Sequence, residues 1–298
     1  MKRIIKISLS ALLALILALL VVLLFYLPRY LSSDAELTPR EADGEDIVIM
    51  STNVRFYNPL DFFKKSWFYR ADLIAEDIAS VRPDIIGFQE STFIHYGYLE
   101  KIMKGYESVN AYRDDFVLSE GCPIFYRADR FEKLDGGSFW LSKTPEKMSK
   151  DWGSEHYRIA VYVLLRDRTT GKEFTVFNTH LDNKSEEARI NGIKVVLDKI
   201  KELGDVPAYL FGDLNATENS ETIRSTLSDF LDSTKIAPVT ENTPTYHGWG
   251  NAEVAKRIDY ILVSRGDVNV SEYHVLDNNH DGVYSSDHSS IYIKTTVR

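Results

Sequence analysis

Five apolar segments of the chain end in residues that could do chemistry. These residues are Asn53, Glu90, His180 with Asp182, Asp213 with Asn215, and Asp287 with His288. Because the end of a rigid strand can present a side chain into a cleft, the five ends could converge on one site. Hard oxygen ligands suit Mg²⁺ or Mn²⁺, a carboxylate can orient water, and a histidine can contact a phosphoryl oxygen. The residue types therefore indicate metal-assisted chemistry on a phosphate ester.

Short strands and a few helices would have to position these residues. The apolar runs 46–53 and 84–90 enclose a segment, 70–81, with Ile74, Ile78 and Val81 at helical spacing, and Pro83 ends it. A second helix begins at Ser185, and Gly204 ends it. Further short β-rich runs lie at 122–126, 159–166, 173–179, 208–211, 258–263 and 290–296. Many strands with few long helices predict an α/β fold of two packed mixed sheets flanked by helices.

The N-terminal part of the chain has a different composition. Residues 7–27 carry no charge and are rich in Leu, Ile, Val and Ala. At about 1.5 Å per residue, a helix of this length matches the hydrocarbon core of a bilayer. We therefore predict a transmembrane helix at 7–27, preceded by a cytoplasmic N-terminus at 1–6. A polar linker would follow at 28–45 and a catalytic domain at 46–298. A cleaved signal peptide is the alternative, although its apolar region would be shorter.

Charge predicts the orientation of this helix. Lys2, Arg3 and Lys6 precede the apolar run, and only Arg29 closely follows it. The positive-inside rule then predicts a single-pass protein of the cell membrane whose catalytic domain is extracytoplasmic. The net charge is −9, and the first 33 residues hold four basic and no acidic residues, which leaves −13 for the remainder. Such a surface does not favour sequence-independent binding to a long polyanion, although a local basic patch is compatible with it. Cys122 is the only cysteine, which excludes an intrachain disulfide.

Six motifs carry a resemblance to one family of enzymes. In chain order they are STNVRF, IIGFQES, VFNTHLDN, LFGDLNA, RIDYILV and SSDHSSI. In this order, and at roughly this spacing, they resemble the endonuclease/exonuclease/phosphatase family over about residues 46–298. The resemblance implies a four-layer α/β sandwich. It also implies in-line attack of water on a phosphomonoester or phosphodiester, with Mg²⁺ or Mn²⁺ as the cofactor.

The resemblance implies roles in metal and substrate binding. Glu90 would be the principal metal ligand, Asn53 would contact metal-bound water or phosphate, and Asp287 would contribute to the metal shell. Arg158, which leads into an apolar strand, is a candidate phosphate contact, although an arginine there is more often a surface residue. Asp182 could belong to the site, or it could only cap the helix that follows it.

The resemblance also implies catalytic roles for five further residues. By resemblance, Asp213 would orient or deprotonate the attacking water, and Asn215 would hold a phosphoryl oxygen. His180 and His288 would contact the phosphate, and Asp259 would hold His288 in place as a carboxylate–histidine pair.

The motifs leave the substrate open. The first hypothesis is hydrolysis of a lipid-headgroup or small-molecule phosphoester, because the linker would keep the cleft near the membrane. The second is a membrane-anchored nuclease, and the third is an inactive tethered binding domain. Nucleic acid is not favoured, since Arg55 stands where apurinic endonucleases of the family carry an acidic residue. An inactive domain has no need of the complete set of site residues, and no protein partner is indicated.

Overall fold

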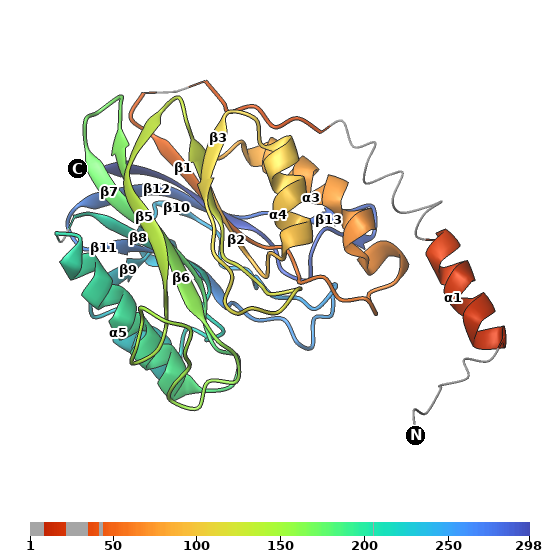
Figure 1. Cartoon of the computed structure of the whole chain (residues 1–298). Helices are drawn as coiled ribbons and strands as arrows, with labels where there is room; N and C mark the ends of the chain where they lie inside the picture. Colours follow the sequence, from red (N-terminus) through yellow and green to blue (C-terminus); the bar gives the residue numbers. More distant parts are fainter. Residues whose placement is uncertain (1–8, 22–34, 42–43, 205) are drawn as a thin grey trace.

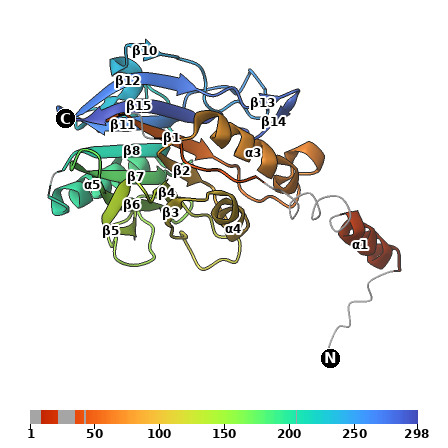
Figure 2. The ribbon, with the colours of Figure 1, turned by 90° about the horizontal axis from the view of Figure 1, so that it is seen from above.

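Two β-sheets stack face to face between two helical layers (Figure 1). The computed structural model describes residues 9–21, 35–41, 44–204 and 206–298. Helices α3 and α4 lie on one side of the molecule and α5 lies on the other, as the view in Figure 2 also shows. The predicted two-sheet α/β sandwich with helices on both outer faces is therefore confirmed for the domain.

The first sheet has seven strands and the second has six. In spatial order the first consists of β10 (Val239–Thr240), β12 (Val268–Val275), β15 (Ile291–Val297), β1 (Ile47–Asn53), β2 (Ile85–Gln89), β4 (Ile124–Arg127) and β3 (Tyr106–Val109). The second consists of β5 (Phe131–Trp140), β6 (Ile159–Asp167), β7 (Glu173–His180), β8 (Ala208–Asp213), β11 (Asp259–Ser264) and β9 (Phe230–Asp232). A separate antiparallel pair is formed by β13 (Asn279–His280) and β14 (Val283–Tyr284).

The central strands are continuous apolar runs because both of their faces are covered. Side chains such as Ile49, Ile85, Val176 and Phe211 fill the layer between the two sheets. Two further apolar clusters fill the outer faces, one beneath α3 and α4 and the other beneath α5. Each sheet is therefore buried on both sides, and polar side chains reach solvent mainly where the strands end.

The helices are α3 (Trp67–Val81), α4 (Phe93–Ile102), α5 (Glu186–Glu202), the short α6 (Glu221–Thr226) and α7 (Ser233–Ile236), and a 3-10 turn, η2 (Phe63–Lys65). The predicted N-terminal cap of α5 is present, since the Ser185 side chain accepts a hydrogen bond from the Ala188 amide. The sequence did not indicate α4. It begins with a capping box in which Thr92 and His95 satisfy each other's backbone amides.

The N-terminal prediction is only partly covered by the structure. Helix α1 comprises the 13 residues Leu9–Val21. In the ranges that the structure describes, no helix is long and apolar enough to cross a membrane. The other residues of the predicted span, 7–8 and 22–27, lie outside those ranges, as does the predicted N-terminus at 1–6.

The predicted free linker at 28–45 needs correction, because residues 35–41 pack against the domain. Leu37 is buried in the cluster beneath α3 and α4, and its amide donates to the carbonyl of Ile102 at 2.7 Å. Arg40 forms a 2.8 Å ion pair with the buried Asp84 at the start of β2. These residues form an arm, because one apolar side chain and one ion pair hold them on the domain. Residues 28–34 lie outside the described part.

Strands β7 and β8 approach each other closely at Gly212, and a substitution there tests this contact. It has a φ of +138°, and a Cβ there would lie 1.9 Å from the carbonyl oxygen of Thr179. We expect Gly212→Ala to lower the free energy of unfolding by about 3 kcal/mol or more. Gly97→Ala in α4 is the matched control, because no atom lies within 4 Å of its Cβ position, and it should stabilise the helix by about 0.5–1 kcal/mol. Denaturant unfolding measures both, and equal stabilities would contradict the close approach.

Candidate active site

The strand ends that carry the predicted residues meet at one edge of the sandwich. In the first sheet, β1 and β2 are parallel, and Asn53 lies opposite Gln89, the residue before Glu90. In the second sheet, β7 and β8 are parallel, and His180 lies opposite Asp213. Strand β11 is antiparallel to β8, so its first residue, Asp259, lies opposite Asp213 as well.

Two buried amide side chains join the sheets just behind this edge. The Nε2 atom of Gln89 donates to Oδ1 of Asn178 at 2.7 Å. The Nδ2 atom of Asn178 donates to the carbonyls of Phe88 at 2.9 Å and Pro123 at 3.0 Å. Gly87 lies beneath them, and a Cβ there would lie 2.1 Å from the ring of Phe211. The absence of a side chain at this position lets the two sheets approach.

Asn53 lies between two carboxylates that come from different sheets. Its Nδ2 atom donates to Oε1 of Glu90 at 3.0 Å and to Oδ2 of Asp213 at 3.2 Å. Its Oδ1 atom accepts from the backbone amide of Arg55 at 2.9 Å, and so faces away from the carboxylates. The amide of Phe56 donates to Oε2 of Glu90 at 2.6 Å. Asn53 thus holds the two acids in place, and its predicted contact with metal-bound water or phosphate stays a prediction.

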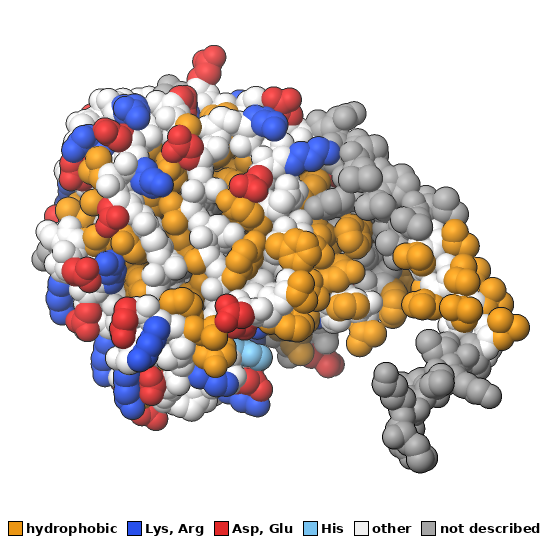
Figure 3. All heavy atoms as spheres, viewed as in Figure 1, with side chains coloured by type: hydrophobic (Ala, Val, Ile, Leu, Met, Phe, Trp, Pro, Cys, Tyr) orange, Lys and Arg blue, Asp and Glu red, His pale blue; other side chains and the backbone are white. Residues whose placement is uncertain are grey.

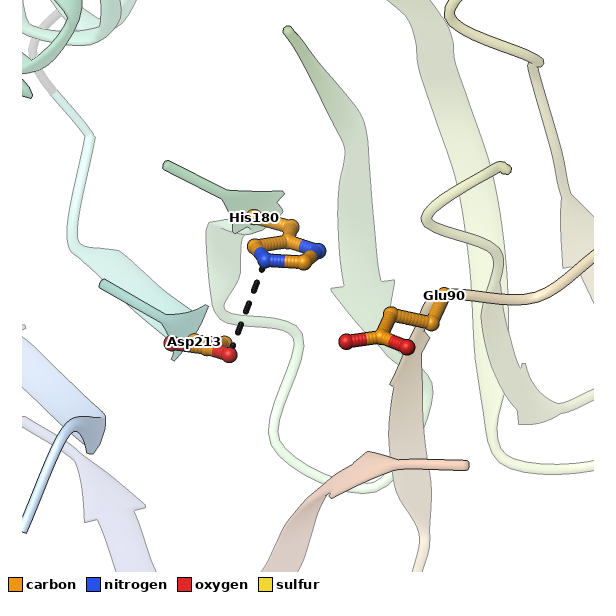
Figure 4. Close-up of side chains that lie close together, drawn as sticks. All are labelled: Glu90, His180 and Asp213. Carbon is orange, nitrogen blue, oxygen red and sulfur yellow. Dashed lines mark ion pairs between the residues drawn. The ribbon is translucent and has the colours of Figure 1, made fainter. Parts of the chain in front are cut away.

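Carboxylates and histidines gather in two groups that could hold a metal ion. Glu90, His180 and Asp213 point toward a common space in Figure 4, and each offers a ligand atom within 4.8 Å of the others. Asp213 also forms a second such group with Asp259 and His288. The carboxylate oxygens of the first group suit Mg²⁺ or Mn²⁺.

Asp287 belongs to neither group, and its predicted place in the metal shell stays a prediction. Its Oδ2 atom lies 3.6 Å from Nη1 of Arg55. Its Oδ1 atom is buried without a hydrogen-bond partner in the described part of the chain. Such an atom is costly to bury unless something pairs with it. The orphaned oxygen on the pocket wall is what a site built around a cation would contain.

Asp213, Asn215 and His180 form a hydrogen-bonded unit. The Nδ2 atom of Asn215 contacts Nε2 of His180 at 2.9 Å, and the Asn215 amide donates to Oδ1 of Asp213 at 2.8 Å. Burial and the charge of Arg158 hold the pKa of His180 well below its usual value. The ring is therefore neutral, and its Nε2 atom can accept a hydrogen bond from the side-chain amide of Asn215. Burial raises the pKa of Asp213 to about 7, and the charge of Asp259 adds to that rise. Asp213 can therefore take up a proton near neutral pH.

His288 is held as a cation by a buried carboxylate. Its Nδ1 atom donates to Oδ2 of Asp259 at 2.9 Å, as the predicted pairing requires. The hydroxyl of Thr245 donates to the same oxygen at 2.6 Å. Burial alone would lower the pKa of His288, but the charge and hydrogen bond of Asp259 raise it to about 10. The other ring nitrogen, Nε2, lies 3.8 Å from Oδ2 of Asp213, so a protonated donor faces the acidic group.

Four basic side chains line the same cavity of about 380 Å³ as the acids. Its cations are Arg55, Arg113, Arg158 and Lys256, and the cavity also contacts the predicted residues Glu90, His180, Asp213, Asn215, Asp287 and His288. The cavity is therefore lined by both charges, since four acidic side chains, Glu90, Glu120, Asp213 and Asp287, lie among these four cations. Arg158 lines the cavity and is buried, so it is not a surface residue, and its predicted phosphate contact stays a prediction.

Sequence reasoning missed the ion pair between Arg113 and Glu120. Arg113 contacts Glu120 through two bonds of 2.8 Å, and both residues line the cavity. Burial raises the pKa of Glu120 to about 7, and the charge of Glu90 adds to it. Both residues lie in the irregular segment between β3 and β4, where no periodicity or motif could have indicated them.

Arg70 of α3 was also missed, because no motif marks it at the start of the predicted helix at 70–81. It is fully buried, and its Nη1 atom donates to the carbonyls of Val54 and Ser285. The Ser286 hydroxyl in turn donates to the carbonyl of Asn53 at 2.6 Å. Arg70 thus joins the end of β1 to the segment that carries His288.

Asp182 is structural, which was one of its two interpretations. Its Oδ1 atom accepts from the amides of Lys184 and Ser185, and its Oδ2 atom accepts from the amides of Glu155 and His156. Burial alone would raise its pKa, but these hydrogen bonds lower it to about 2. Asp182 therefore holds the turn that leads into α5 and the 154–156 turn beside the cavity.

Asp213→Asn and His288→Ala should each lower the turnover number on any substrate by at least about 10²-fold. The first removes the buried proton acceptor, and the second removes the cation that faces it. His274→Ala is the control, because His274 pairs with Glu241 and Glu272 outside the cavity. Steady-state kinetics with thermal melts as a check on folding measures the effect, and an unchanged turnover number would remove that residue from the mechanism.

Comparison with known proteins gives a family match over most of the chain. The Endonuclease/Exonuclease/phosphatase family model matches residues 50–288. Among solved structures, an endonuclease/exonuclease/phosphatase from Bacteroides vulgatus is 31% identical with a TM-score of 0.80, and the match covers 85% of this chain and 99% of that one. A mannosyl-6-phosphatase from Bacteroides thetaiotaomicron is 29% identical with a TM-score of 0.78, over 84% of this chain and 99% of that one.

Curated relatives are more distant and longer. Nocturnin of Drosophila melanogaster is 25% identical over 66% of this chain but only 33% of its own length, and Protein angel of the same organism is 26% identical over 67% of this chain and 60% of its own. The chain thus spans a third to three fifths of these relatives. With the family model matched from β1 to His288, the chain belongs to the endonuclease/exonuclease/phosphatase family.

Proposed function

We propose that this protein hydrolyses the phosphoester of a small molecule or a lipid headgroup, with Mg²⁺ or Mn²⁺ as its cofactor. The observation that carries the proposal is that one cavity is lined both by an acidic group, Glu90 with Asp213, and by four basic side chains. A cation site facing a set of arginines is what a phosphoryl group in transfer needs, because negative charge accumulates on its oxygens.

The chain's own residues supply proton transfer and positioning. Glu90 would hold the metal ion, with Asp213 and Asp287 on the same wall, and the bound ion would neutralise charge on the phosphoryl oxygens. Asp213 accepts a proton from the attacking water, since its raised pKa of about 7 gives it sufficient basicity. The cationic His288 donates a hydrogen bond to a phosphoryl oxygen. Asn215 positions His180, because its Nδ2 atom contacts the His180 ring and donates to the carbonyl of Leu181.

The cavity favours a compact substrate. Its volume of about 380 Å³ is at the small end of ligand sites. One of the similar structures is named a mannosyl-6-phosphatase, and this supports a sugar phosphate as a candidate substrate here. A nuclease is the alternative, supported by relatives named as the exoribonuclease subunit Ccr4, one of which is 26% identical over 48% of this chain. The acidic charge of the domain does not favour it.

We further propose that residues 7–27 anchor the protein as a single membrane span, with the domain outside the cytoplasm. The uncharged, Leu-rich sequence supports the span, and Lys2, Arg3 and Lys6 before it support the orientation.

Turnover should require a divalent cation and should prefer a small phosphoester. A panel of sugar phosphates, phosphatidylinositol phosphates, sphingomyelin, RNA, and single-stranded and duplex DNA, each assayed with Mg²⁺ or Mn²⁺, would identify the substrate. Chelation should abolish activity, and either ion should restore it. Full activity in excess chelator, without retained metal, would contradict the assignment of Glu90. Higher activity on RNA or DNA than on every small phosphoester would favour the nuclease.

Orientation can be tested with protease on intact cells. We expect the domain to be degraded from outside, as detected with an antibody to the C-terminus. Protection until the membrane is lysed would reverse the proposed topology and make nucleic acid the leading substrate. Release by alkaline carbonate would show that the protein is not held by a membrane span.

A further inference from the structure

Residues 60–65 form an exposed loop, the apolar loop. The side chains of Leu60, Phe62 and Phe63 are 74%, 63% and 77% exposed, and Lys64 and Lys65 follow directly. Isolated exposed hydrophobic residues are ordinary, whereas a contiguous group marks an interaction site. The three side chains are bulky and lie within four consecutive positions.

The loop holds these side chains outward through its own hydrogen bonds. The Asn58 side chain accepts from the amide of Leu60 at 3.0 Å, and the Asn58 carbonyl accepts from the amide of Asp61 at 2.9 Å. Phe63 has a φ of +53°, a conformation that an aromatic residue rarely adopts. Backbone strain of this kind tends to occur where function requires it. Phe63 is therefore exposed as part of a defined turn.

The apolar loop lies beside the catalytic cavity. Asp61 contacts Arg55 at 3.3 Å, and Arg55 lines the cavity. The packing of Trp67 against His95, with ring centroids 4.2 Å apart, brings the first turns of α3 and α4 together. Phe93, which is 51% exposed, therefore lies at the same end of this helix pair.

A second exposed pair lies close to the cavity. Phe116 and Val117 are 65% and 71% exposed, and they lie between Arg113 and Glu120 in the sequence, both of which line the cavity. In Figure 3, hydrophobic side chains gather on the face that carries α3 and α4. Exposed hydrophobic residues thus lie near the cavity on two different segments.

The course of the N-terminal arm points to the occupant. The arm packs at the C-terminal ends of α3 and α4. In the sequence, residues 28–34 connect the apolar segment 7–27 to this arm. Seven residues reach at most about 25 Å. The 15 residues of α3 extend over about 22 Å. A bilayer that held the N-terminal residues could therefore lie level with the apolar loop.

We propose that the apolar loop inserts into the surface of a lipid bilayer and holds the catalytic cavity at the level of the headgroups. Leu60, Phe62 and Phe63 would enter the boundary of the acyl chains, while Lys64 and Lys65 pair with anionic headgroups. The proposal rests on the proposed membrane location, and it narrows the substrate to phosphoesters presented at that surface.

Site-directed labelling tests the insertion. In the full chain, Phe62→Cys would carry a polarity-sensitive fluorophore, because the native Cys122 is buried and would not react. Val239→Cys is the matched control, since Val239 is a 52% exposed hydrophobic residue on β10, at the edge of the first sheet beyond β12. After reconstitution in vesicles of phosphatidylcholine and phosphatidylglycerol, we expect a lipid-borne quencher to act on the label at 62 and iodide to act on the label at 239.

Equal responses at the two positions would overturn the proposal. A response at 62 that depends on protein concentration and not on lipid would assign the loop to a contact with a second copy, which would also overturn it.

Kinetics with Leu60→Ser, Phe62→Ser and Phe63→Ser combined separates this inference from the proposed function. On a phosphoester embedded in vesicles, KM should rise at least about tenfold, because three inserted apolar side chains are lost. On a soluble phosphoester such as p-nitrophenyl phosphate, kcat/KM should be unchanged. Equal losses in both assays, or in neither, would overturn the inference. Inactivity of the unaltered protein on every phosphoester would instead refute the proposed function, while the quenching result would still decide the insertion.

Discussion

The contact between the two sheets at Gly87 is the constraint on which the site depends. The ring of Phe211 occupies the space where any other residue in position 87 would place its Cβ. Immediately above it, the Nε2 atom of Gln89 donates to Ser51 and Asn178, and the Nδ2 atom of Asn178 donates to two backbone carbonyls, so the side-chain N–H groups of both residues are paired. Unsatisfied amides would be costly to bury there, so the hydrogen bonds fix one relative position of the sheets. Neither sheet carries a complete set of catalytic groups, and this fixed position brings the two incomplete sets together.

Charge is balanced within the site in two different ways. Between Glu90 and Asp213, the neutral amide of Asn53 provides hydrogens that reduce the repulsion of the two acids. Between Asp213 and Asp259, a protonated His288 provides a full positive charge. The first arrangement has two carboxylates and no positive charge between them, whereas in the second the protonated His288 offsets one of the two carboxylates. The negative charge is therefore greater beside Glu90 than beside His288, and this difference favours a metal ion on the Glu90 side.

The sequence was informative where a residue's position follows from strand periodicity. Asn53, His180 and Asp213 are each the last residue of a strand, so reading the apolar runs placed all three at one edge. The sequence was uninformative where the position of a residue depends on tertiary contacts. Arg113 and Glu120 reach the cavity from an irregular segment, and α4 is a helix with aromatic residues around much of its circumference. The arm was misjudged because Leu37 is a single apolar residue in a polar stretch, and only the groove at the ends of α3 and α4 makes it part of the core.

The docked arm also determines where mechanical load would enter the domain. Any pull on the chain ahead of residue 35 is borne first by the Leu37 backbone bond and the ion pair of Arg40 with Asp84. Both lie at the end of the first sheet where β1 begins, and Asn53 is at the other end of that strand. Tension on the N-terminal segment would thus be absorbed by the arm before it could reach β1. The first points of load therefore lie at the opposite end of the first sheet from the candidate site.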